Sequence, residues 1–352
     1  MKKHKLNTGI GRMIEIEGKD YLYFSGTSYL GIPQDIDFLD ILANNVFEYG
    51  SNFGQSRKNN IQLEVFDEFE TFFAQEAGAD AGALFSSGYL AGIAAWKSVI
   101  SQVDEVWIAP DAHPAVIPDG HLASDQLNFK QWKIDCLEKA ESLSSRSILI
   151  IGNAVDALNV QIHDYSWVEE IGKKHKVWLL VDDSHAFGVL GNGIFGTYSK
   201  MQYDSVSVIV SGSLGKGLGL PAGIVLCPDY HIDHIKNLPL FAGASPGSPA
   251  HIRTFLEMQH TYEAAHEHLK ELCQYFYELI AFMPQIIGNP DYPVFRYTED
   301  SWVEQLEKSG IITSSFPYPH ADSPKVNRIV LSAFHEKEDI EYLADILENL
   351  AL

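Results

Sequence analysis

A lysine in a glycine-rich loop is the residue of this sequence whose surroundings most favour covalent chemistry. The segment SGSLGKGLG (211–219) places Lys216 among four glycines and two serines, directly after an apolar run. A desolvated lysine amine forms a Schiff base with an aldehyde. A phosphate-binding P-loop would instead need Ser or Thr where Gly217 stands. Viewed alone, the segment is equally compatible with a surface turn whose lysine is solvated.

An aspartate and a histidine precede this lysine in the segment VWLLVDDSHAFG. Asp182 ends an apolar run, and His185 follows three residues later. A carboxylate at that point could face the protonated ring nitrogen of a pyridine cofactor and stabilise the charge that makes the ring an electron sink. The alternative is that the polar residues 182–184 cap the next helix.

Two other segments could contribute to the same site. In SSGYLAG (86–92), Ser87 is a good helix N-cap and Gly88 permits close approach of a ligand to a helix N-terminus, where phosphates bind. An ordinary capped helix has the same pattern. His113 in APDAHPAV is either a solvated side chain or a ring that stacks on a cofactor. The four segments together supply a phosphate seat, a ring stack, a ring-nitrogen partner and a Schiff-base lysine, as pyridoxal 5′-phosphate requires.

The elements that must position these side chains alternate between apolar strands and amphipathic helices. We expect strands at 83–85, 106–109, 148–152, 177–182, 207–211 and 222–228, and helices at 60–78, 88–100 and 167–176. Continuous apolar strands of this kind are typical of an α/β fold with a mostly parallel sheet covered by helices. Ligands bind such sheets at the carboxyl ends of the strands, and each segment named above follows a predicted strand.

The pattern changes near residue 249. Residues 249–282 are compatible with helix for over 30 residues, and strands then alternate with helices to a terminal helix at 336–350. We therefore expect a smaller α+β domain at the C-terminus. The predicted division is an N-terminal arm (1–33), a large cofactor-binding α/β domain (34–240) and a small domain (241–352), with a boundary where Pro, Gly and Ser cluster.

Composition argues against several classes of function. The 352 residues include 47 acidic and 25 basic ones, giving a net charge of −22 at pH 7. Such a surface repels nucleic-acid backbones and anionic lipid, so we expect neither partner. The basic N-terminal residues are not followed by an apolar run, so we expect no signal peptide, and no run of about 20 apolar residues predicts a membrane span. Its three scattered cysteines suit a reducing compartment, which predicts a cytoplasmic protein.

Histidines elsewhere do not predict a metal site. His231 and His234 are three residues apart, and His266 and His268 lie in the long predicted helix. A metal site needs further ligands in register, which the neighbouring sequence lacks. We interpret these histidines as parts of solvated helix faces and expect no metal.

In its motifs, the sequence resembles the α-oxoamine synthase family, whose members include 8-amino-7-oxononanoate synthase and 2-amino-3-ketobutyrate CoA ligase. These are fold-type-I pyridoxal-phosphate enzymes, of the aminotransferase class I/II type. The similarity runs from about residue 20 to the C-terminus through FSGTSYLGI, LFSSGYLAG, VDDSHAFGVLGNGIFG, SGSLGKGLG and NRIVLSAFHEKEDIEYLADIL. The resemblance implies a pyridoxal 5′-phosphate cofactor and condensation of an amino acid with an acyl-CoA, usually with loss of carbon dioxide. It also implies a homodimer with its site at the interface.

The resemblance also implies roles for individual residues. Lys216 matches the Schiff-base lysine that later moves the Cα proton, and Asp182 matches the partner of the pyridine nitrogen. His113 matches the histidine that stacks on the ring, and His185 the one near the 3′ oxygen. Residues matching the phosphate-binding positions are Ser87, Gly88, Tyr89 and Ser213, and those matching the carboxylate-binding positions of the amino-acid substrate are Arg328 and Thr27.

The sequence departs from the family pattern near the substrate. Thr27 replaces an asparagine, Asn153 an acidic residue and Ala157 a serine, and Gly243 lies where a partner subunit usually supplies a Ser-Thr-Ser phosphate contact. Three functions therefore stay open: the condensation, another pyridoxal-phosphate reaction such as transamination or aldol cleavage, and a non-catalytic homologue. Lys216 argues against the last, because an inactive subunit commonly loses that lysine.

Overall fold

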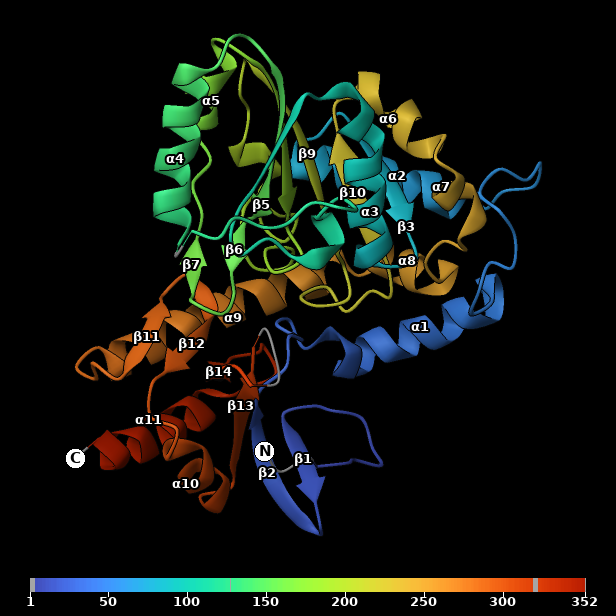
Figure 1. The fold of residues 1–352 in the computed structure, drawn as a ribbon. Coiled ribbons are helices and arrows are strands. Elements are labelled where there is room, and N and C mark those ends of the chain that lie inside the picture. The colour runs from blue at the N-terminus through green and yellow to red at the C-terminus, as the bar shows by residue number, and fades with distance from the viewer. Residues whose placement is uncertain (1–3, 127, 319–321, 352) are drawn as a thin grey trace.

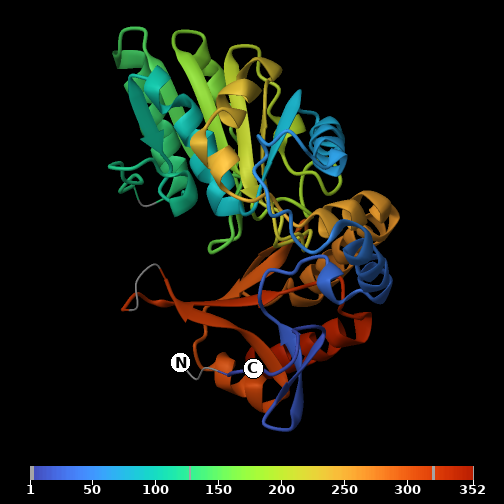
Figure 2. The ribbon, with the colours of Figure 1, turned by 90° about the vertical axis from the view of Figure 1, so that its right-hand side faces the viewer.

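The computed structural model describes residues 4–126, 128–318 and 322–351. Two bodies, each built around its own sheet, lie one above the other in Figures 1 and 2, with the long helix α9 (Gln259–Ile280) between them. The upper body contains the four predicted cofactor segments around Ser87, His113, Asp182 and Lys216. The lower body combines the C-terminal part of the chain with its N-terminal strands.

A six-stranded sheet with the order β3-β10-β9-β8-β5-β4 forms the centre of the upper body. Its strands are β3 (Ala81–Phe85), β4 (Glu105–Ile108), β5 (Ser147–Asn153), β8 (Lys176–Asp182), β9 (Val206–Ser213) and β10 (Gly223–Cys227). The neighbours β4, β5, β8 and β9 pair in parallel, while β10 runs antiparallel to both β3 and β9. This mostly parallel sheet confirms the predicted fold class.

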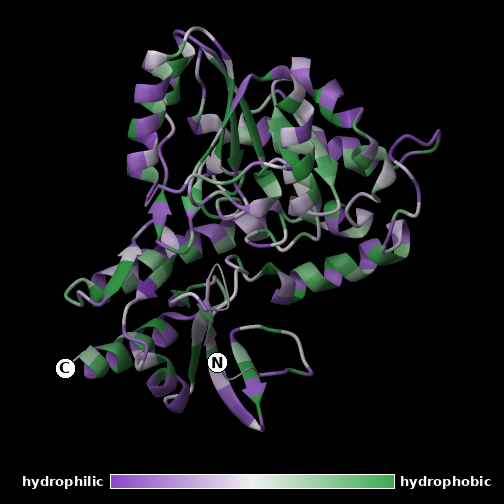
Figure 3. Cartoon of the chain, viewed as in Figure 1, coloured by the Kyte–Doolittle hydropathy of each residue, from purple (hydrophilic) through white to green (hydrophobic). Residues whose placement is uncertain are grey.

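Alternate residues of the strands pack against different helices, so both faces of the sheet are covered. On β8, Trp178 and Leu180 belong to the apolar cluster formed with α3 (Gly88–Val99) and α6 (Asp229–Lys236). Val177, Leu179 and Val181 belong to the cluster on the opposite face. The helices on that face are α2 (Glu64–Ala77), α4 (Phe129–Ser142) and α5 (Val168–Gly172). Figure 3 shows the resulting apolar strands inside a layer of mixed helices.

The predicted helix at 60–78 begins later than expected, at Glu64. Phe66, Phe69 and Phe73 are completely buried at helical spacing, as the periodicity indicates. Glu70 lies on the same helix and is also buried, bound to Arg57 at 2.9 Å and to Lys236 at 2.7 Å. These ion pairs compensate the buried carboxylate and connect α2 to its neighbours.

The lower body is a six-stranded sheet with the order β1-β2-β13-β14-β12-β11. The predicted N-terminal arm supplies β1 (Met13–Ile16) and β2 (Lys19–Phe24), and β2 pairs in parallel with β13 (Ile311–Pro317). The other strands are β11 (Ile286–Asn289), β12 (Tyr292–Tyr297) and β14 (Lys325–Val330), accompanied by α10 (Trp302–Lys308) and α11 (Lys337–Ala351). This sheet carries Arg328 on β14.

The prediction of a continuous helix over 249–282 is wrong in one respect. The structure has two helices there, α8 (Pro249–Glu257) and α9. Met258 separates the two with φ −111° and ψ 28°, outside the helical region. No proline or glycine marks the break in the sequence.

The remaining elements are α1 (Ile36–Tyr49), α7 (Pro239–Gly243), the short pair β6 (Val155–Asp156) and β7 (Gln161–Ile162), and 3₁₀ turns at Ile32–Gln34, Ile100–Gln102, Pro114–Val116 and Tyr198–Lys200.

The expectation of solvated helix faces is wrong for His231, His266 and His268, whereas His234 is exposed as expected. His231 is 1% exposed, and its Nε2 lies 2.8 Å from the hydroxyl of Ser98. His266 and His268 are partly buried, each with Nε2 within hydrogen-bond distance of a backbone carbonyl oxygen. These side chains therefore satisfy internal hydrogen bonds. Within the described ranges, no group of three or more His, Cys, Asp and Glu side chains is placed to hold a metal ion.

Candidate active site

The carboxyl ends of β8 and β9 bring the predicted aspartate and lysine into one neighbourhood. Asp182, the last residue of β8, is in register with Ser211 on β9, and Lys216 lies in the loop that follows β9. The negative charge of Asp182 acts on the Lys216 ammonium and favours its charged form. The structure thus brings together two residues that are 34 positions apart in the sequence.

The loop that carries Lys216 is fixed at both ends. The Leu214 amide donates to the Ala222 carbonyl, and the Leu220 amide donates to the Leu214 carbonyl, each at 3.0 Å. Desolvation lowers the pKa of Lys216, the nearby Arg328 lowers it further, and Asp182 opposes both. A lowered pKa increases the fraction of neutral amine, which is the nucleophilic form.

The two adjacent aspartates have different surroundings. Asp182 accepts a hydrogen bond from the Ser184 amide through Oδ1 at 2.8 Å, and no donor among the described residues bonds to its Oδ2. Asp183 is fully buried and accepts hydrogen bonds from the amide and hydroxyl of Thr197 at 2.6 and 2.7 Å. Burial raises the pKa of Asp183 to about 7. Asp182 therefore retains an open acceptor, whereas Asp183 holds the following loop.

His113 lies beside Asp182, just beyond β4. Its Nδ1 is 3.9 Å from Asp182 Oδ2 and accepts the Ala115 amide hydrogen at 3.2 Å. Desolvation lowers the pKa of His113, and Lys216 lowers it further, against an opposing effect of Asp182. Because Nδ1 already accepts a hydrogen bond, the ring is neutral and the contact with Asp182 is no ion pair. A neutral, half-exposed imidazole suits the stacking role predicted for this residue.

The N-terminus of α3 packs against the end of β9. Ser87 caps the helix by accepting a hydrogen bond from the Leu90 amide at 3.3 Å. A Cβ on Gly88 would lie 2.5 Å from Ser213, so only glycine fits this approach. The first-turn amides of Gly88 and Tyr89 have no partner within the helix, which makes them available to an anion. The Tyr89 side chain is 55% exposed, and its contact to a phosphate stays a prediction.

Arg328 is a buried cation with unused hydrogen-bond donors. It is 7% exposed, its Nη1 donates to the Ala157 carbonyl at 3.2 Å, and its Nε is buried without a partner. Its guanidinium also lies 5.0 Å from the centre of the Phe316 ring. An incompletely bonded guanidinium is a natural partner for a carboxylate. Thr27 is partly buried in the turn after β2, and its predicted role beside Arg328 stays a prediction.

His185 makes contacts that the sequence analysis did not include. Its Nδ1 lies 2.8 Å from the hydroxyl of Tyr29, which in turn lies 3.3 Å from the hydroxyl of Tyr292. Both tyrosines are fully buried. Tyr29 is part of the FSGTSYLGI motif, so that motif could have indicated it. Tyr292 comes from β12 and belongs to none of the motifs.

The positions that depart from the family pattern have defined neighbours here. Asn153 ends β5, its side-chain oxygen accepts the His113 amide hydrogen at 3.1 Å, and its amide group donates to the Asp111 carbonyl. Asn153 therefore fixes the backbone that presents His113. Ala157 contacts Arg328 through its carbonyl, and Gly243 ends α7 with open space around its Cα.

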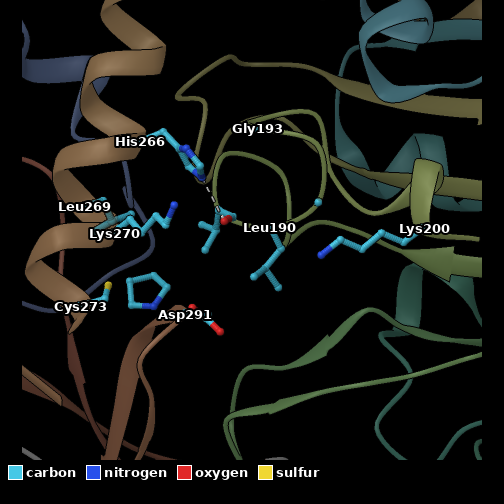
Figure 4. A pocket seen from close by; sticks show the side chains of 11 residues that line it. Leu190, Gly193, Lys200, His266, Leu269, Lys270, Cys273 and Asp291 are labelled. Atoms are coloured by element: carbon cyan, nitrogen blue, oxygen red, sulfur yellow. Dashed lines mark hydrogen bonds between the residues drawn. The ribbon is translucent and has the colours of Figure 1, made fainter. Parts of the chain in front are cut away.

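A separate cavity of about 170 Å³ lies between α9 and the loop that follows His185. Figure 4 shows Lys200, His266 and Lys270 around it, with apolar side chains such as Leu190 and Leu269. None of the predicted site residues lines this cavity.

In the described part of the chain, no helix has both the length and the apolar character needed to cross a membrane.

Comparison with solved structures supports the fold. A serine palmitoyltransferase from S. paucimobilis with bound PLP-myriocin aldimine superposes with a TM-score of 0.82 at 17% identity, over 99% of this chain and 92% of that chain. An 8-amino-7-oxononanoate synthase from Francisella tularensis superposes with a TM-score of 0.72 at 18% identity, over 94% of this chain and 99% of that chain. These likenesses extend over nearly the whole chain and confirm the predicted fold-type-I fold.

Comparison of sequences identifies the family. The chain is 27% identical to an 8-amino-7-oxononanoate synthase of Petrotoga mobilis over 98% of its length and 92% of the relative, and 24% identical to 8-amino-7-oxononanoate synthase 1 of Bacillus subtilis over 97% and 91%. These relatives confirm the resemblance to α-oxoamine synthases drawn from the motifs. The model of the family described as aminotransferase class I and II matches residues 42–347. This match spans most of the chain, which therefore belongs to the aminotransferase class I and II family.

Proposed function

We propose that the chain is a pyridoxal-phosphate-dependent C-acyltransferase that condenses an amino acid with an acyl-CoA to give an α-oxoamine. One observation carries the proposal. Lys216 and Asp182 lie at the carboxyl edge of the sheet, close enough for the charge of Asp182 to raise the pKa of the Lys216 amine. The serine palmitoyltransferases and 8-amino-7-oxononanoate synthases that the chain resembles support the same activity. The likeness to these enzymes also supports a homodimer, and the absence of disulfide bonds among the cysteines, all three of which are free, supports a cytoplasmic location.

The residues present fit pyridoxal phosphate. Asp182 Oδ2 is an acceptor without a donor among the described residues, as a protonated pyridine nitrogen needs. The α3 N-terminus, packed on Ser213 at a position where any side chain larger than glycine would collide, is a seat for the phosphate. Lys216 would hold the aldehyde carbon, and His113 would cover the ring. When bound, the cofactor supplies an electron sink that stabilises negative charge at the substrate Cα.

The chain's own residues then account for binding and proton movement. The free donors of Arg328 would hold the carboxylate of the amino acid, which orients the Cα–H bond toward Lys216. Lys216 Nζ would remove the proton from Cα and return one after the new carbon–carbon bond has formed. The lowered pKa of Lys216 increases the fraction of this amine in the basic form. Asp182 Oδ2 would accept the hydrogen of the ring nitrogen.

Trapping the cofactor on the enzyme tests the core of this proposal. Purified protein is mixed with pyridoxal phosphate and reduced with borohydride, and the modified peptide is located by mass spectrometry. We expect modification at Lys216, its loss in Lys216→Ala, and its retention in Lys200→Ala, which removes a lysine outside the site. Saturating cofactor that leaves Lys216 unmodified would contradict the proposal and favour a non-catalytic homologue.

A second assay separates condensation from other pyridoxal-phosphate reactions. The loaded enzyme is incubated with glycine, alanine or serine and a set of acyl-CoA thioesters, and free CoA thiol is measured. Release of thiol that requires both substrates supports the condensation. Formation of a keto acid without thiol release supports transamination, and aldehyde formation from a β-hydroxy amino acid supports aldol cleavage.

A further inference from the structure

Three side chains from separate parts of the chain form a hydrogen-bonded row next to the site. Tyr292 comes from β12 in the lower body, Tyr29 from the turn after β2, and His185 from the loop after β8. The Tyr292 and Tyr29 hydroxyls are 3.3 Å apart, and the Tyr29 hydroxyl is 2.8 Å from His185 Nδ1. The row therefore connects both bodies of the molecule through its hydroxyl groups.

The number of protons available decides the direction of these hydrogen bonds. Each tyrosine has one hydroxyl hydrogen to donate, and a neutral imidazole has one protonated and one unprotonated nitrogen. If Tyr292 donates to Tyr29, and Tyr29 donates to His185 Nδ1, every hydroxyl hydrogen has an acceptor. If Nδ1 instead carried the proton, Tyr29 would have to donate to Tyr292. The buried Tyr292 hydrogen would then lack an acceptor among the described residues.

The charges around the row favour the same neutral state. Desolvation lowers the pKa of His185 well below its usual value, and the nearby Lys216, Arg328 and His113 lower it further. Burial raises the pKa of both tyrosines, so both hydroxyls keep their hydrogens. The row thus consists of neutral groups in which each proton has one favoured position.

We infer that Tyr29, held in place by Tyr292, fixes His185 as the tautomer protonated on Nε2, so that an N–H donor faces the site. Nε2 has no hydrogen-bond partner among the described residues, so its hydrogen is free for an anionic oxygen of a bound molecule. Tyr29 and Tyr292 act as positioning residues because they work through His185. The assignment adds to the proposed function but does not depend on it, since the tautomer is a property of the chain without cofactor.

Nitrogen-15 NMR of the cofactor-free protein tests the inference directly. The protein is labelled on its histidine ring nitrogens, and His185→Gln identifies the His185 resonances among those of the 14 histidines. We expect one tautomer, with the Nε2 shift typical of a protonated nitrogen and the Nδ1 shift typical of an unprotonated one. A protonated Nδ1 in the wild type would overturn the inference.

Single-hydroxyl variants then test which tyrosine holds the tautomer. Tyr29→Phe should move both His185 shifts toward the average of two interconverting tautomers, and Tyr292→Phe should give a smaller movement in the same direction. Tyr297→Phe is the matched control. Tyr297 is a second buried tyrosine on β12 whose hydroxyl bonds to Thr313 at 2.7 Å, outside the row. His185 shifts that stay at their wild-type values in Tyr29→Phe would also overturn the inference.

Two control measurements separate effects on folding and on cofactor binding from effects on the tautomer. Thermal unfolding of each variant shows whether it is folded at the NMR temperature, and Tyr292→Phe provides a second measurement if Tyr29→Phe is unfolded. Borohydride trapping at Lys216 is measured in parallel. If His185 is protonated on Nε2 but pyridoxal phosphate is not trapped on Lys216, only the proposed function is contradicted. If pyridoxal phosphate is trapped but His185 is protonated on Nδ1, only this inference is contradicted.

Discussion

Asp182 is in register with Ser211 across the parallel strands β8 and β9, and this pairing determines where Lys216 can lie. The two strands end at the same edge of the sheet, and the loop after β9 returns over that edge to β10. The Asp183 amide donates to the Ser211 carbonyl at 2.8 Å and locks the register at its last residue. The site is therefore positioned by the core of the sheet and not by a mobile loop.

Replacing Asp182 tests its role beside the ring nitrogen. Asp182→Asn retains an oxygen for the Ser184 amide, so the fold should be preserved, but it removes the negative charge from the site. We expect the rate of acyl transfer to fall about 100-fold or more, as with other groups that act in the transition state. The measurement is the initial rate at saturating cofactor. A rate within about twofold of wild type would exclude Asp182 from the chemistry.

Asp183 should make stability depend on pH. Its pKa is raised to about 7 in the fold, so the unfolded chain loses this proton at lower pH than the folded protein does. The contribution of Asp183 to stability is therefore full below about pH 4 and is lost as the pH rises to about 7. Asp183→Asn imitates the protonated carboxyl, and its stability relative to wild type should increase by about 4 kcal/mol over that range.

Urea unfolding at several pH values measures this difference between Asp183→Asn and wild type. Asp204→Asn is the control, because Asp204 is an exposed carboxylate near the same sheet. Its stability relative to wild type should change little with pH. A constant difference between Asp183→Asn and wild type would show that the fold does not raise the pKa of Asp183.

Gly88→Ala tests the seat proposed for the phosphate. The added methyl group would lie 2.5 Å from the Cα, Cβ and N atoms of Ser213, so α3 or the end of β9 must move. We expect a loss of about 1–3 kcal/mol in unfolding free energy and weaker binding of pyridoxal phosphate. Gly243→Ala is the control, since nothing lies within 4 Å of the added atom. Unchanged cofactor affinity in Gly88→Ala would place the phosphate elsewhere.

Arg328→Gln should separate binding of the amino acid from binding of the cofactor. The change removes a buried cation whose Nε lacks a partner, so amino-acid affinity should fall about 10- to 100-fold, while cofactor trapping at Lys216 continues. Titration of the visible spectrum with amino acid gives the affinity. Arg253→Gln removes an equal charge from an exposed ion pair on α8 and should leave the amino-acid affinity unchanged. Equal affinities in the two variants would remove Arg328 from the site.

The sequence predicts those features that depend on local pattern. Strands β5 and β8 are continuous apolar runs, and the polar segments that follow strands meet at one sheet edge because parallel strands must place them there. The reversed direction of β10 was also predictable, because the nine residues between Ser213 and Gly223 are too few for a parallel crossover.

Other features depend on long-range packing that no local pattern contains. Tyr292 reaches Tyr29 across 263 positions of sequence. The break at Met258 has neither proline nor glycine, and the burial of His231 depends on a contact with Ser98, 133 positions away. For Tyr292 and His231 the partner side chain lies in another element, so spacing within one segment carries no signal for the contact.

The parallel pairing of β2 with β13 has a consequence for synthesis on the ribosome. β2 ends at Phe24 and its partner begins at Ile311, so the partner strand is translated only after most of the polypeptide has emerged. The upper body has all its strands by Cys227 and can become compact while translation continues. β1 and β2 can pair with each other early, but the other edge of β2 must wait for β13, and an open strand edge of this kind can pair with other chains.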